Sequence, residues 1–114
     1  MQVQKIQNNY NPNFSARVFY IDKNNLLSKG MKDAFTKMCK DLGKSTDEIY
    51  LTVEKGGKKS GEIEKDIFNG FIKQEKRKTT FKEELNVWAN REYSMPRNLT
   101  NIYIDYIMPA FKKL

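Results

Sequence analysis

The chain has 114 residues, of which 31% are charged and 12% aromatic, and 21 basic against 14 acidic side chains give it a net charge of +7. This length fits one domain, and so many aromatic residues exclude a disordered chain. The single cysteine, Cys39, excludes an intrachain disulfide, and the lack of histidine excludes Ser-His-Asp and Cys-His catalysis and the usual zinc sites.

The first thirteen residues, MQVQKIQNNYNPN, are polar and rich in asparagine. We expect residues 1–13 to form a flexible arm and residues 14–114 to form a single domain. The N-terminus has no apolar core of a signal peptide, and no apolar run approaches 18 residues. We therefore expect no membrane segment and a cytoplasmic location, which means the host cytoplasm if the gene is viral.

The first half of the domain predicts a strand, a helix and a second strand. FSARVFYI, residues 14–21, alternates and is rich in β-branched and aromatic residues, as strands are. From residue 26 to residue 42 apolar residues recur every three or four positions, and Gly43 supplies the stop of an amphipathic helix. EIYLTVEK, residues 48–55, alternates again, with Ile49, Leu51 and Val53 on one face.

The stretch EKGGKKSGE, residues 54–62, resembles a phosphate-binding loop only superficially. Gly56 and Gly61 have the right separation, but Glu62 and Ile63 stand where such a loop needs lysine and serine or threonine. Glycines between two alternating segments are typical of a hairpin turn. Residues 62–74 then predict a third strand, with a bulge at Gly70.

The last third of the chain predicts two helices. Thr80 and Glu83 form a capping box before Phe81, Leu85 and Trp88, which predicts a helix over residues 80–92. A turn at residues 94–96 then precedes a last amphipathic helix, which Pro109 should kink or end. The order β-α-β-β-α-α predicts a single two-layer α+β domain, a small and mainly antiparallel sheet with helices packed on one face.

Positive charge is concentrated on the hairpin and on the loop after the third strand. Residues 55–78 carry eight basic and four acidic side chains, which is more than half of the net charge of +7. A regular strand separates the two ends of this region by about 40 Å, so we expect two basic patches. The candidate contacts for nucleic acid or another acidic partner are Lys55, Lys58, Lys59, Lys73, Lys76, Arg77 and Lys78.

Other constellations in the sequence carry weaker signals. Glu62, Glu64 and Asp66 alternate on one strand and could bind magnesium, although a solvated face is the simpler interpretation. Cys39 fits a buried and inert thiol. Five aromatics fall on predicted strands, as in the sheets of single-strand binders: Phe19, Tyr20, Tyr50, Phe68 and Phe71. Tyr20 and Tyr50 are the better contact candidates because their hydroxyls allow partial exposure, and Tyr103 is a further one.

These features favour a small, basic, non-enzymatic binding module without a cofactor or metal, whose commonest partner would be nucleic acid. One alternative is a protein–protein inhibitor or adaptor, for example a phage-encoded inhibitor of a host nucleic-acid-processing or defence enzyme. A second alternative is a metal-dependent enzyme that uses the carboxylate cluster. The sequence also leaves open a homodimer formed through the last helix.

Overall fold

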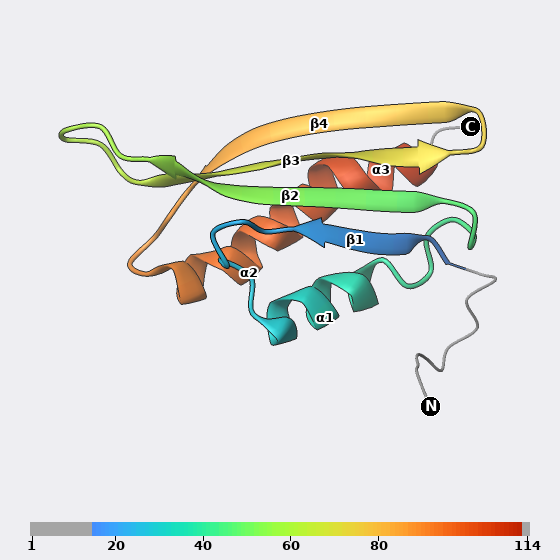
Figure 1. Ribbon diagram of the computed structural model, residues 1–114, viewed down its shortest axis with the longest axis horizontal. Coiled ribbons are helices and arrows are strands. Elements are labelled where there is room, and N and C mark those ends of the chain that lie inside the picture. Colours follow the sequence, from blue (N-terminus) through green and yellow to red (C-terminus); the bar gives the residue numbers. More distant parts are fainter. Residues whose placement is uncertain (1–14, 113–114) are drawn as a thin grey trace.

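The strands of the domain form one mixed sheet. The computed structural model describes residues 15–112, so the predicted arm, residues 1–13, lies outside the described residues. Within them the sheet order is β1-β2-β3-β4. The strands are β1 (Arg17–Ile21), β2 (Glu48–Gly57), β3 (Lys65–Gln74) and β4 (Arg77–Asn86). β1 is parallel to β2, and the other two pairs are antiparallel (Figure 1).

The parallel pair of strands explains the place of the first helix. Parallel neighbours need a crossover connection, and α1 (Lys29–Met38) supplies it between β1 and β2. The side chain of Ser28 caps this helix by accepting the N–H of Met31 at 3.1 Å. The predicted α+β class, with a mainly antiparallel sheet, is confirmed.

The helix predicted over residues 80–92 is wrong, because β4 occupies most of that range. β4 pairs with the whole of β3, from Gln74 opposite Arg77 to Lys65 opposite Asn86. Phe81 and Leu85 are four residues apart, a spacing that places two side chains on one face of a strand as well as of a helix. Trp88, the third member of the predicted stripe, is 45% exposed. The observed order is therefore β-α-β-β-β-α.

The C-terminal segment is one continuous helical stretch. It comprises α2 (Arg91–Ile102), the π-helical η2 (Tyr103–Ile107) and α3 (Met108–Lys112). The turn predicted at residues 94–96 is wrong: the side chain of Asn90 accepts the N–H of Tyr93 at 2.9 Å and starts the helix there, so that Pro96 lies inside α2. Pro109, which has no N–H to donate, is the second residue of α3, and the helix continues past it to Lys112.

Both helical segments pack against the same face of the sheet, called here the core face. Ile49, Leu51 and Val53 of β2 are fully buried there, as the alternation predicts. Phe35 and Cys39 join this core from the α1 side, together with Leu99, Ile102, Ile107 and Ala110 from the C-terminal helices. The apolar side of the last helix is thus used inside the domain.

The hairpin between β2 and β3 projects beyond the rest of the sheet (Figure 1). Gly57 and Gly61 have positive φ angles of 88° and 77°, which explains why the turn needs glycine. The register shifts between Lys55 and Gly57, so the bulge is at Gly56, whereas Gly70 is in regular register opposite Leu51. The bulge predicted at Gly70 is therefore wrong.

Candidate functional site

The face of the sheet opposite the core face, called here the open face, carries side chains in ordered rows. The register aligns Arg17, Glu48, Lys73 and Lys78 in one row across the four strands. The next row consists of Phe19, Tyr50, Phe71 and Thr80, and a third of Ile21, Thr52, Asn69 and Lys82. All of these side chains are exposed or half-buried. None of the helices in residues 15–112 packs on this face.

Three aromatic rings of the second row stack on one another. The centroids of Phe19 and Tyr50 are 4.9 Å apart with planes inclined by 19°, and those of Tyr50 and Phe71 are 4.5 Å apart with planes inclined by 24°. Such cross-strand aromatic pairs stabilise a sheet. Because Tyr50 is covered on both sides, this aromatic column leaves one outer ring face on Phe19 and one on Phe71.

A cation lies over each outer ring face of the aromatic column. The guanidinium carbon of Arg17 is 5.7 Å from the centroid of Phe19, and the ammonium nitrogen of Lys78 is 4.3 Å from that of Phe71. Both distances are within the range of cation–π attraction. Arg17 also forms an ion pair with Glu48 at 2.8 Å. The column therefore presents ring edges and positive charge to solvent.

The hydroxyl of Tyr50 is tied to the same charged row. It donates to a carboxylate oxygen of Glu48 at 3.2 Å. Partial desolvation, together with this hydrogen bond to the negative Glu48, raises the pKa of Tyr50 above its ordinary value. The hydroxyl therefore stays protonated at neutral pH and acts as a donor.

The predicted basic residues fall into two groups at opposite ends of the sheet (Figure 1). Lys55, Lys58 and Lys59 are exposed on the hairpin. Lys73, Lys76, Arg77 and Lys78 are exposed around the β3–β4 turn, and Lys73 and Lys78 adjoin the aromatic column.

Arg77 has a structural contact in addition. Its guanidinium donates to the carbonyl oxygen of Ala110 at 2.8 Å, and also to the side chain of Gln74. The bond to Ala110 fastens α3 to the start of β4. A substitution at Arg77 would therefore change the packing of the last helix as well as the surface charge.

The three tyrosines predicted as contacts have different surroundings. Tyr50 is on the open face, whereas the Tyr20 hydroxyl lies under α1, where it donates to the carbonyl of Lys32 at 2.8 Å and lies 2.6 Å from Thr36 Oγ1. Burial raises the pKa of Tyr20 well above its ordinary value. Tyr103 is half-buried, and desolvation raises its pKa as well.

The sequence named Phe19 and Phe71 as strand aromatics but did not place them among the preferred contacts. Strand alternation carries the missing signal: Phe19 neighbours Tyr20, and Phe71 neighbours the fully buried Ile72, so each phenylalanine lies on the face opposite its core-facing neighbour. The alternation alone does not determine which of the two faces of the sheet packs against the helices.

Two of the three predicted carboxylates are engaged by an arginine. Arg91 Nε donates to Asp66 Oδ2 at 2.8 Å, and Arg91 Nη2 donates to Asp66 Oδ1 at 3.0 Å and to Glu64. These hydrogen bonds and the negative charge of both carboxylates raise the pKa of Arg91. In the described part of the chain, no group of three or more Cys, Asp or Glu side chains is placed to hold a metal ion.

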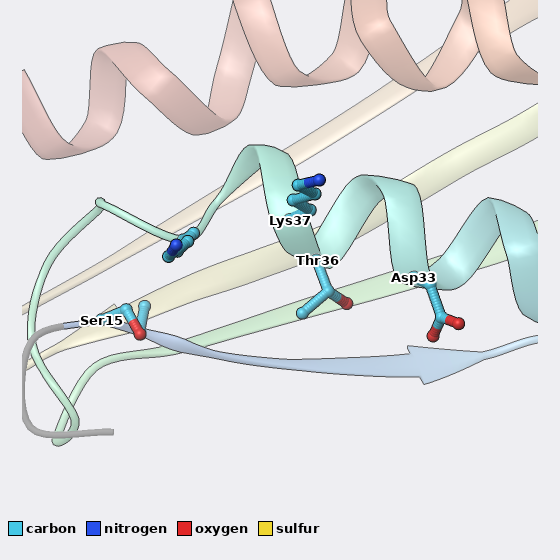
Figure 2. Close-up of a pocket in the computed structure, with 6 residues that line it drawn as sticks. Ser15, Asp33, Thr36 and Lys37 are labelled. Atoms are coloured by element: carbon cyan, nitrogen blue, oxygen red, sulfur yellow. The ribbon is translucent and has the colours of Figure 1, made fainter. Parts of the chain in front are cut away.

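A separate hollow of about 400 Å³ lies between β1 and α1 (Figure 2). Its lining residues are Ser15, Ala16, Asp33, Thr36, Lys37 and Lys40. Asp33 is paired with Lys29 at 2.8 Å, and the hydroxyl of Thr36 lies 2.6 Å from that of Tyr20. Asp33 and Thr36 are thus already partnered within the domain, and the open face is the stronger candidate site.

The remaining chemistry of the described residues is limited. Burial raises the pKa of the Cys39 thiol to about 12, which keeps it protonated and unreactive at neutral pH. No helix within residues 15–112 is both long and apolar enough to cross a membrane. Comparison of the chain with protein-family models, with curated proteins and with solved structures finds no match.

Proposed function

We propose that this chain is a non-enzymatic module that binds nucleic acid, with the open face and the two basic groups as its contact surface. The observation that carries this proposal is the aromatic column on the face that the helices leave uncovered, with a cation at each end. Large rings outside the core, bordered by positive charge, are characteristic of binding surfaces for phosphate-linked bases.

The charge distribution supports a polyanionic partner. Lys73, Lys78 and Lys82 are exposed along the β3–β4 side of the open face, and the hairpin lysines extend the positive surface beyond the sheet. Phosphate contacts made by such lysines would give binding that depends on salt and only weakly on sequence. The proposal places the protein in the cytoplasm, or in the host cytoplasm if the gene is viral.

The test is fluorescence anisotropy with labelled single- and double-stranded oligonucleotides, titrated at low and at near-physiological salt. We expect dissociation constants in the micromolar range or below, with affinity that falls steeply as salt rises. Polyglutamate serves as a competitor of similar charge and should displace the oligonucleotide poorly. The absence of binding at low salt would overturn the proposal.

A second candidate function, a protein–protein inhibitor or adaptor, is favoured by a different surface. Trp88 and Tyr93 are 45% and 68% exposed near the start of α2, and Ile63 is 47% exposed at the base of the hairpin. The N–H of Val87 donates to the carbonyl of Glu64 at 2.8 Å, which brings the Ile63 and Trp88 segments together. If this surface binds a protein, Trp88→Ala should abolish retention of that partner in a pull-down and leave oligonucleotide binding unchanged.

A further inference from the structure

We infer that the outer face of the Phe71 ring is a stacking position for one unpaired base, so that the module selects single-stranded over double-stranded nucleic acid. This inference rests on the proposed function. It follows from the asymmetry between the two ends of the aromatic column, and from what surrounds the end at β4.

At the β1 end of the column the outer ring face is held closed. Arg17 lies over Phe19 and is itself fixed by its ion pair with Glu48. Displacing Arg17 would break both contacts. A base approaching Phe19 would therefore compete with two interactions of the same side chain.

At the β4 end the outer ring face is covered only by the side chain of Lys78. Lys78 lies 4.3 Å from the Phe71 centroid and is exposed, and among the described residues no carboxylate forms an ion pair with it. A lysine side chain carries large rotamer freedom, and an exposed cation–π contact is weak. Lys78 can move off the ring at little cost and remain close enough to bind a phosphate.

The space beside the Phe71 ring matches a base flanked by phosphates. Thr80 is directly opposite Phe71 in the register, and it is exposed with a side chain far smaller than a ring. Lys78 and Lys82 are two residues before and after it, on the same face of β4. A base stacked on Phe71 above Thr80 would thus have a cation on either side for its 5′ and 3′ phosphates.

The geometry of this stacking position favours an unpaired base over a base within a duplex. A base within a duplex has both faces covered by its neighbours, so it cannot also stack on a protein ring without leaving the helix. An unpaired base offers its π-face freely, and stacking on an aromatic ring is tolerant of base identity. Single strands of mixed sequence are therefore the expected ligand.

The experiment compares two variants with the intact chain, using one labelled single strand of mixed sequence and its duplex. Phe71→Leu keeps an apolar side chain but removes the ring, and it should weaken single-strand binding about tenfold without changing the salt slope or duplex binding. Phe71→Tyr, the matched control, should bind as the original chain does.

Thr80→Tyr tests the same position without removing any native contact. The new ring lies directly opposite Phe71, so it should extend the aromatic column, keep or raise the melting temperature and exclude the base. Single-strand affinity should fall about tenfold in this well-folded variant. If both variants bind single strands as tightly as the original chain, the stacking position is wrong while the proposed function stands. If the original chain binds neither strand form, the proposed function itself fails.

Discussion

The guanidinium of Arg91 lies against the carboxylate of Asp66 in a two-pronged contact, with distances of 2.8 and 3.0 Å. The Asp66 side chain is only 1% exposed, and that of Arg91 is 21% exposed. This ion pair joins the start of β3 to the start of α2. It neutralises a carboxylate that would otherwise be buried without a partner.

Arg91→Ala should therefore destabilise the fold by about 3–5 kcal/mol, because it leaves the Asp66 charge buried and unpaired. Chemical denaturation followed by circular dichroism measures this change. Adding Asp66→Asn to Arg91→Ala should recover part of the loss, since the uncompensated charge is removed. Arg97→Ala, an exposed position on the same helix, is the control, and an equal loss there would contradict the assignment.

The hairpin lysines should contribute to nucleic-acid binding through their charge. Lys58→Glu/Lys59→Glu should weaken binding to every sequence about equally and reduce the magnitude of the salt slope by roughly 2, because two phosphate contacts are lost. Lys37→Glu/Lys40→Glu makes the same change in net charge on exposed positions of the α1 side. Anisotropy titrations that show equal losses for both double variants would mean that the hairpin has no specific role.

Gly70 should tolerate no side chain. A Cβ atom built there would lie 1.8 Å from the carbonyl oxygen of Tyr50, on the neighbouring strand, so β2 and β3 would have to separate. Gly70→Ala should cost at least about 1–3 kcal/mol of the free energy of unfolding, the range for overpacked sites.

Gly30→Ala is the matched control for Gly70→Ala. Its Cβ would meet nothing closer than Ser28 Oγ at 3.8 Å, and alanine favours the helix, so stability should rise by up to about 1 kcal/mol. Thermal and denaturant unfolding of the two variants should give changes of opposite sign. A Gly70→Ala protein as stable as the original would show that the two strands are not so closely spaced.

Alkaline pH should destabilise the fold in part through Cys39. Burial raises the pKa of this thiol from 9.0 to about 12, so above pH 9 the unfolded chain loses the proton while the folded chain retains it. The stabilisation is complete below pH 9 and is lost as pH rises from 9 towards 12, at a limiting slope of about 1.4 kcal/mol per pH unit.

The measurement is the free energy of unfolding between pH 8 and 10.5 for the original chain and for Cys39→Ala. The variant should be less stable below pH 9 because a small cavity replaces the thiol, but its stability should fall less steeply above pH 9, so that the two curves converge. Parallel curves for the two proteins would refute a titrating, buried thiol. Slow labelling of Cys39 by a thiol reagent at pH 8, accelerated by denaturant, gives an independent check.

The sequence alone determined the features that depend on near neighbours along the chain. Alternation at Ile49, Leu51 and Val53 was sufficient to identify β2 and to place these three side chains on one face. Gly57 and Gly61, placed between two alternating segments, predicted a hairpin because its turn needs residues that tolerate positive φ. The absence of histidine and the excess of lysine follow from composition and need no structure.

Tertiary structure decided everything that depends on distant partners. Phe81 and Leu85 fit a helix and a strand equally well, and pairing with β3 selected the strand. Proline at position 96 predicts a turn locally, yet the cap at Asn90 and burial of Met95 and Leu99 favour a continuous helix. The aromatic column requires Phe19, Tyr50 and Phe71 to be aligned across three strands. This alignment depends on the sheet register and on which face the helices cover. Neither follows from local periodicity, because side-chain contacts across strands join residues that are distant in the sequence.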